Sequence, residues 1–385
     1  MAAVKFAVID VSDFLSKKQA ADTTLAPEWA KLEELYNKKL WHQITLTLLD
    51  LVKTPSLQQG DNLIQLYNNF LNTIENKINP LSLIEIVAYI VQQFPNKRDA
   101  VAFLEKMEPK VKINDEALAL CKVLQGQIYL EQLNDLEATE KVIDHLENTL
   151  EDADGVTPVH GRFYKLASEY YKKRGPVERY YRATLRYVGC RGGGAELPLA
   201  ERRQAALSLA IAAVTAPKVY DLGELMVHPI LESLEGTPDS WARDLVAAAA
   251  SGDVAAFEKL RATAPCPALR ENDQLMRQKI AILCLMELAF NRTSMSRKLS
   301  FTEIGNAARV PKDEVELLLM KALAEKLIRG HIDQVSECAW ISWVRPRALG
   351  RAGAAALASR VDAWRLAVRK AEDLLTERAG DVFVA

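Results

Sequence analysis

The sequence has few residues that could form a disulfide framework or a local metal site. Its five cysteines are widely separated and contain no CxxC pair: Cys121, Cys190, Cys266, Cys284 and Cys338. This pattern indicates reduced thiols in a reducing compartment. The five histidines show no HxH, HExxH or HxxxH spacing: His42, His145, His160, His228 and His331. A zinc site could therefore form only from residues that are distant in sequence.

Long apolar runs and a strong net charge are also missing. The N-terminal segment is interrupted by Asp10, and no later apolar run approaches the ~18 residues that a membrane span requires. The formal net charge is −2 over 385 residues, which excludes a global basic field although not a local basic patch. We therefore expect a soluble, intracellular protein of two or three domains.

Motifs of common enzyme classes are absent as well. The triple glycine at 192–194 lacks the Lys-Ser/Thr pair of a phosphate-binding loop, and no GxSxG sequence occurs. The scattered cysteines have no neighbouring base that would activate them as nucleophiles. The sequence thus favours a protein without catalysis, cofactor or metal, and a hydrolase with a nonlocal site stays open as an alternative.

A succession of amphipathic helical patterns runs from Pro27 to about Phe290. Trp29, Leu32, Leu35, Leu40 and Ile44 begin one pattern, Asn79-Pro80 precedes another, and Asp99 could cap a third. Short helices joined by tight turns cannot bury their apolar faces singly, so stacked pairs in a solenoid are expected. The segments Cys190–Pro198 and Thr263–Pro267 are the clearest breaks.

A winged-helix pattern follows between Leu299 and Pro346. Ser300 and Glu303 have capping-box spacing, Pro311 can open a second helix, and two apolar strands then form a ribbon. The second strand, with Trp340, Ile341, Trp343 and Val344, is apolar on both faces. One face is expected to pack on Leu319 and Leu323. The other face, or an open strand edge, could accept a neighbouring chain or be buried internally.

Winged helices often bind DNA through their second helix, but the charge of this one argues against that function. Between Pro311 and Leu327, three lysines (Lys312, Lys321, Lys326) stand against four acids (Asp313, Glu314, Glu316, Glu325), a net charge of 3 − 4 = −1. Arg345, Arg347 and Arg351 form a basic cluster after the ribbon. Nucleic-acid binding through this cluster remains an alternative.

Beyond Arg347 the sequence predicts one long helix ending at about Ala379. Its apolar residues are separated by 4, 3, 4, 3 and 4 positions, and we call them the seam: Leu357, Val361, Trp364, Val368, Ala371 and Leu375. This spacing is typical of a helix that packs along another helix. Docking into a helical bundle and packing back on its own domain are the two interpretations.

A helical array that leads into a winged helix and a terminal helix resembles the PCI family, which supplies subunits to the proteasome lid, the signalosome and translation-initiation complexes. Local segments are similar to the proteasome-lid members of that family: Trp29–Gln43, Asn79–Ile86, His228–Leu234, Leu283–Leu288, Asp313–Leu323, Gly330–Asp333 and Asp381–Val384. The fold class that we expect is mainly α: a right-handed helical-repeat solenoid, a winged-helix (PCI) module and a long C-terminal helix. We divide the chain into an N-terminal segment (1–24), a helical-repeat array (25–175), a PCI domain (176–347, with its helical part at 176–293 and its winged helix at 294–347) and a docking helix with its tail (348–385).

The resemblance implies a non-catalytic scaffold subunit of the regulatory-particle lid, acting in ubiquitin-dependent degradation in the cytoplasm and nucleus. In this family, winged helices associate edge to edge and C-terminal helices gather into a bundle. The seam and the ribbon residues Trp340, Ile341, Trp343 and Val344 are therefore the expected contacts with other lid subunits, with no membrane and no direct nucleic acid involved. A scaffold of a signalosome or translation-initiation complex is the other family-level alternative.

Overall fold

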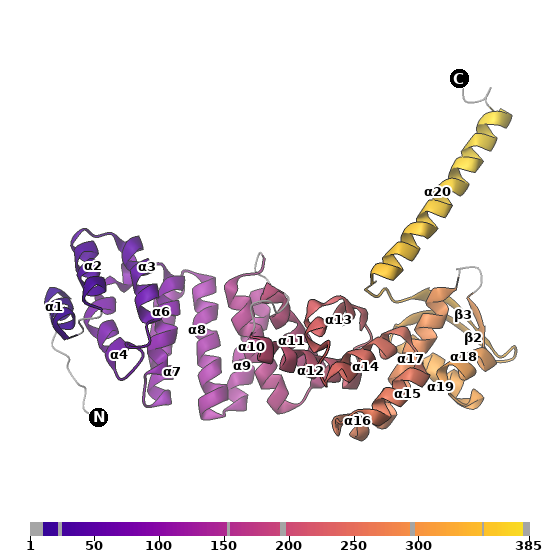
Figure 1. Cartoon of the computed structure of the whole chain (residues 1–385), viewed down its shortest axis with the longest axis horizontal. Helices are drawn as coiled ribbons and strands as arrows, with labels where there is room; N and C mark the ends of the chain where they lie inside the picture. Colours follow the sequence, from indigo (N-terminus) through magenta and orange to yellow (C-terminus); the bar gives the residue numbers. More distant parts are fainter. Residues whose placement is uncertain are drawn as a thin grey trace. The chain divides into compact units, whose positions relative to one another are not determined.

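The structure is a computed structural model that describes residues 11–21, 25–151, 155–192, 198–292, 297–348 and 350–379. These residues are mainly helical and include one three-stranded sheet (Figure 1). The chain separates into two compact units, residues 1–175 and 176–385, which are described in turn.

The first unit is a stack of short helices. Helices α1 to α3 pack on one another in sequence, as do helices α6 to α10, and α6 also packs on both α3 and α8. Leu83, Ile84, Ile86 and Val87 of α6 are all buried, because α6 has helices on more than one side. The elements are α1 (Val11–Ala21), α2 (Ala26–Asn37), α3 (Trp41–Val52), α4 (Asn62–Leu66), η1 (Tyr67–Leu71), α5 (Asn72–Ile74), η2 (Glu75–Lys77), α6 (Pro80–Gln92), α7 (Lys97–Val111), α8 (Asp115–Ile128), η3 (Tyr129–Leu133), α9 (Leu136–Glu151) and α10 (Pro158–Arg174). The expected solenoid of helices is confirmed.

The turns of this unit correct two local predictions. The pattern that begins at Trp29 forms two helices. Lys39 has a φ of 56°, a left-handed conformation that interrupts the helix between α2 and α3. Helix α7 is capped by the Asn96 side chain, which accepts a hydrogen bond from Arg98 N at 3.2 Å, and Asp99 lies in the first turn instead. Helix α6 begins after Asn79, as expected, and the Asn79 side chain caps it by accepting from Leu81 N at 3.0 Å.

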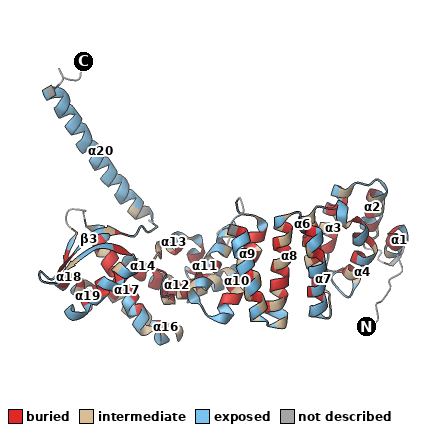
Figure 2. Ribbon diagram, turned by 180° about the vertical axis from the view of Figure 1, so that it is seen from behind, coloured by how far each residue is buried: buried red, intermediate tan, exposed pale blue. Residues whose placement is uncertain are grey.

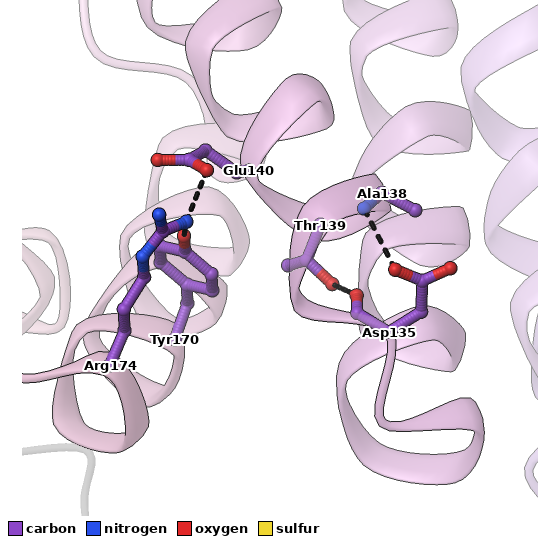
Figure 3. A network of polar contacts seen from close by, with 6 residues as sticks. All are labelled: Asp135, Ala138, Thr139, Glu140, Tyr170 and Arg174. Carbon is purple, nitrogen blue, oxygen red and sulfur yellow. Dashed lines mark hydrogen bonds and ion pairs between the residues drawn. The ribbon is translucent and has the colours of Figure 1, made fainter.

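A polar network fixes the connection of α8, α9 and α10 (Figure 3). Asp135 begins α9 by accepting a hydrogen bond from Ala138 N at 3.0 Å, and its carbonyl accepts one from Thr139 Oγ1 at 2.7 Å. At the end of α10, the Arg174 guanidinium contacts both Glu140 of α9 and the hydroxyl of Tyr170. Arg174 therefore links the last turn of α10 to α9.

The second unit contains the remaining helices and the sheet. Helix α17 is central to it and packs on α14, α15, α18, α19 and β3. Its residues Ile280 to Met286 are all buried (Figure 2). The elements are α11 (Val177–Cys190), α12 (Leu199–Thr215), α13 (Gly223–Val227), η5 (Pro229–Leu234), α14 (Ser240–Ser251), α15 (Val254–Thr263), α16 (Ala268–Glu271), α17 (Asp273–Asn291), β1 (Lys298–Ser300), α18 (Phe301–Ala308), α19 (Lys312–Ala324), β2 (Ile328–Asp333), β3 (Cys338–Val344) and α20 (Arg351–Ala379). One apolar core thus joins the helices to the winged helix.

A buried lysine organises the end of α12. Lys279 of α17 is 5% exposed, and its ammonium donates to the carbonyl oxygens of Ala213 (2.5 Å), Val214 (3.3 Å) and Ala216 (2.7 Å). These carbonyls lie at the C-terminal end of α12, where the helix has no further backbone N–H groups to donate to them. Burial lowers the pKa of Lys279 to about 7, while the carbonyls and the negative end of α12 favour the charged form.

The winged helix has one more strand than the sequence predicted. Strand β1 pairs with β3, so the antiparallel sheet has the order β1-β3-β2 and β3 is central. The capping box is only half formed: Ser300 Oγ accepts from Glu303 N at 3.3 Å, but the Glu303 carboxylate pairs with Arg292. Pro311 immediately precedes α19, as its fixed φ allows.

Residues 345–348, which follow β3, are held to the body of this unit. Arg345 N donates to the Leu327 carbonyl at 2.8 Å, and the Arg347 guanidinium pairs with Glu287 of α17. At Gly223 the backbones approach so closely that a Cβ would lie 2.4 Å from the Ala348 carbonyl oxygen. This segment is therefore fixed by contacts that depend on a glycine.

We predict that Lys279→Met destabilises the chain by about 1–3 kcal/mol, because three buried carbonyl oxygens lose their donor while most of the side-chain volume remains. The free energy of unfolding, measured by urea denaturation, tests this. The matched control is Lys259→Met on the exposed surface of α15, which should change stability by less than about 0.5 kcal/mol. Equal stability of Lys279→Met and wild type would contradict the assigned role.

We predict that Gly223→Ala loosens residues 345–348, at a cost of about 1–3 kcal/mol, since the new methyl group collides with the backbone at Ala348. Hydrogen exchange at residues 345–348 should become faster. In the control Gly189→Ala, the added Cβ meets nothing within 4 Å, so helix propensity makes the change neutral or mildly stabilising. Unchanged exchange in Gly223→Ala would show that the close contact is not needed.

Candidate partner-docking surfaces

Helix α20 carries an exposed apolar surface. It spans 29 residues, or ~44 Å at 1.5 Å per residue. Every residue from Ala354 to Arg378 is exposed, including all six seam residues, and Trp364 is 70% exposed (Figure 2). The seam therefore does not pack on the described residues of its own domain. Large apolar side chains in such a continuous row are typical of an interaction site.

The seam belongs to a wider apolar sector. At about 100° per residue, the six seam residues fall within ~40° on either side of one line. Ala356, Ala363, Ala367 and Leu374 form a second row beside it, with Arg360 and Arg378 between the two rows, so the mainly apolar sector covers roughly 160° of the helix. Charged residues such as Asp362, Arg369 and Asp373 lie on the opposite side with Leu366. A sector this wide suits a bundle, in which a helix contacts two neighbours, better than a two-stranded coiled coil.

The residues predicted for the ribbon are divided between core and surface. Ile341 and Val344 are buried in the core of the second unit, together with Leu319 of α19. Trp340 is 41% exposed, and Trp343 is half-buried on the outer face. Because β3 is the central strand, the wholly open edges of the sheet belong to β1 and β2. Of the four predicted contact residues, Trp340 and Trp343 are the two that a partner could reach.

A β-bulge at Ser342 explains this division. The register pairs Arg329 with Trp343 and Gly330 with Ile341, which leaves Ser342 as the extra residue. Ser342 Oγ donates to the Arg329 carbonyl at 3.1 Å. The bulge turns Ile341 and Val344, three positions apart, to the same buried face. The sequence alone showed only that β3 was apolar on both faces.

The basic cluster after the ribbon does not form a common surface. The Arg347 side chain is mostly buried, pairs with Glu287, and lies 5.9 Å from the centre of the Phe290 ring. Arg345 is exposed, and the side chain of Arg351 lies outside the described residues. The exposed face of α19 presents acids together with Leu317 and Met320. Nucleic-acid binding by this helix is thus disfavoured by charge.

The other sequence-level candidates have local structural environments. His160 caps the start of α10, where its Nδ1 accepts from Thr157 N at 3.0 Å, and His228 Nδ1 accepts from Ile230 N at 3.2 Å. All five cysteines are free thiols, and burial raises the pKa of Cys121 to about 12 and that of Cys284 to about 11. Within the described ranges, no three His, Cys, Asp or Glu residues gather as metal ligands would. Those ranges likewise hold no helix whose length and apolar character would suit a membrane span.

Sequence reasoning did not find several residues that shape these surfaces. Gly223 and Lys279 carry no local motif, because the groups that they contact lie more than 60 residues away. Arg329 and His331 could have been found as the outward positions of an alternating strand that faces the two tryptophans.

Two protein-family models match successive segments of the chain. The family model described as PSD13 N-terminal repeats matches residues 28–246. The family model described as PCI domain matches residues 265–343, which include the winged helix. The first match alone covers more than half of the 385 residues.

Curated relatives match over nearly the whole chain. A 26S proteasome non-ATPase regulatory subunit 13 homolog B of Arabidopsis thaliana is 33% identical over 369 residues, covering 91% of this chain and 93% of the relative. The 26S proteasome non-ATPase regulatory subunit 13 of Dictyostelium discoideum is 33% identical, covering 88% and 90%. A probable 26S proteasome regulatory subunit of Schizosaccharomyces pombe is 31% identical, covering 98% of each chain. The resemblance to proteasome-lid PCI proteins is therefore confirmed, and the chain belongs to the family of 26S proteasome non-ATPase regulatory subunit 13.

Proposed function

We propose that this protein is a non-catalytic structural subunit of the proteasome regulatory-particle lid, in which it supports lid assembly and ubiquitin-dependent protein degradation. Membership of the subunit 13 family supports the complex, since the relatives are named as regulatory, non-ATPase subunits. The observation that carries the scaffold role is the unbroken exposed seam of α20. We assign the chain to the cytoplasm and the nucleus, where proteasomes act.

Each segment has a part in this proposal. Residues 25–175 are the helical-repeat array, 176–347 the PCI domain and 348–385 the docking helix with its tail. The seam residues of α20 would join a bundle with the C-terminal helices of other lid subunits. The exposed part of the winged-helix ribbon, Trp340 and Trp343, would contact a neighbouring subunit.

The energetics favour docking as the purpose of α20. Burying a side chain of the size of Leu357 or Trp364 contributes about 1.5–3 kcal/mol, and the seam offers five large apolar residues in a row. Part of that gain offsets the cost of association and of ordering side chains. An isolated helix with so much exposed apolar surface has no comparable stabilisation from its own domain. A protein partner therefore explains the seam better than nucleic acid, which would require basic residues.

We predict that Trp364→Glu abolishes incorporation into the lid, because it places a charge in the apolar seam. The unfolding free energy of the isolated chain should change by less than about 0.5 kcal/mol, since Trp364 is exposed there. The measurement is native affinity purification of the tagged chain, with co-purified lid subunits quantified by mass spectrometry.

Leu366→Glu is the matched control. Leu366 is 53% exposed, lies two residues away and points to the opposite side of α20. This variant should recover lid subunits at wild-type levels. Equal recovery by Trp364→Glu and wild type would exclude the seam as the docking surface, and unfolding of the isolated Trp364→Glu chain would indicate that the seam packs within its own domain.

A further inference from the structure

The outward face of the winged-helix sheet combines aromatic and cationic side chains. Lys298 of β1 and His331 of β2 both stand directly opposite Trp340 of β3. One bulge further along, Arg329 stands opposite Trp343. We call these five residues the outer sheet face. They come from all three strands and lie opposite the side that Ile341 buries.

The two tryptophans of this face are partly covered by their neighbours. The His331 ring is stacked on Trp340 with an interplanar angle of 16° and 6.2 Å between ring centres. The Lys298 ammonium lies 5.2 Å from the centre of the same indole, and the Arg329 guanidinium lies 4.7 Å from that of Trp343. Trp340 is thus held between a cation from one neighbouring strand and an imidazole from the other. Cation–π contacts of this kind fix the positions of both the ring and the charge.

Asp333, the last residue of β2, offsets part of the positive charge of this face, because hydrogen bonds from Ser336 and the Lys298 ammonium lower its pKa and keep its carboxylate charged. No described carboxylate forms an ion pair with Lys298 or Arg329. The Asp333 carboxylate accepts from Ser336 N at 3.0 Å, and Glu337 of the β2–β3 turn pairs with Lys312 of α19. The outer sheet face therefore presents two cations without a described ion-pair partner beside aromatic rings, with the Asp333 carboxylate nearby.

We propose that the outer sheet face binds an acidic segment of a neighbouring lid subunit, whose carboxylates pair with Lys298 and Arg329 while its apolar side chains cover Trp340 and Trp343. This proposal rests on the scaffold function and adds the chemistry of one partner. Tryptophan and arginine are the residue types that most often dominate the binding energy of protein interfaces. Charge complementarity would add orientation and a faster association rate.

A single-stranded nucleic acid fits this face less well. Bases stack on aromatic faces that are free, whereas Trp340 is held between Lys298 and His331, and Trp343 is covered by Arg329. The phosphate backbone is bound by a row of cations, whereas this face carries only Lys298 and Arg329 and has the Asp333 carboxylate beside them. An acidic protein segment, in contrast, can bind with as few as two carboxylates, one paired with Lys298 and one with Arg329.

The test measures binding of the full-length chain to lid from which this subunit is missing, at about 50 and 250 mM salt. The variant is Lys298→Glu/Arg329→Glu. The matched control is Lys259→Glu/Arg270→Glu, which reverses two exposed charges on α15 and α16 of the same unit. Circular dichroism establishes that each chain is folded, and the milder Lys298→Gln/Arg329→Gln removes the charges should the reversal disturb folding.

We expect wild type and the control to bind equally and to weaken at higher salt. The variant should bind about tenfold or more weakly at low salt and lose most of the salt dependence. Wild-type affinity in both sheet variants would overturn the proposal. If wild type itself fails to bind the depleted lid, the scaffold function is what fails.

A single-stranded RNA of about 20 nucleotides serves as the competing probe. We expect no binding to wild type beyond that of the Lys259→Glu/Arg270→Glu control. RNA binding that the sheet variant loses, with lid binding unchanged, would overturn the acidic-segment proposal in favour of nucleic acid.

Discussion

The main constraint on this molecule is that a helix of 10 to 20 residues can bury its apolar face only against another element. In the first unit, α6 and α8 meet this constraint because they lie between neighbouring helices, so that residues on nearly every side of each helix are buried. In the second unit, α17 does the same between α14, α15 and the winged helix. Helix α20 is as apolar along its seam as these helices, yet the described residues supply nothing to cover it. The constraint that builds the solenoid is therefore not met for α20 by the described residues, and this is the observation behind the proposed docking role.

The winged helix obeys a related constraint, which applies to strands. Successive residues of a strand point to opposite faces, so an apolar strand next to solvent would leave half of its side chains exposed. The bulge at Ser342 reduces this exposure by turning both Ile341 and Val344 inward. The tryptophans that remain outside are partly covered by side chains of β1 and β2. The module is thus packed on one side and left with a small, chemically distinct face on the other.

Most of the fold could be predicted from the sequence, because it depends on local periodicity. The long helix, the winged helix and the breaks near Cys190 and Thr263 follow from spacing and from proline or glycine positions. What periodicity missed depends on contacts between distant residues. Strand β1 is only three residues long and is defined by its pairing with β3. The Glu303 carboxylate, expected to complete the capping box with Ser300, pairs with Arg292 instead. The roles of Gly223 and Lys279 likewise become visible only when α13 meets residue 348 and α17 meets α12.

The exposure of α20 also affects the chain before assembly. A newly made copy keeps Leu357, Val361, Trp364, Val368 and Leu375 in water until a partner covers them. Continuous apolar surface of this kind promotes self-association and is the feature that chaperones and quality-control proteases recognise in unassembled proteins. Under the proposed docking role, an uncovered α20 would mark any copy made in excess of its partners. The clearance of such unassembled chains would then match the abundance of this protein to that of its partners.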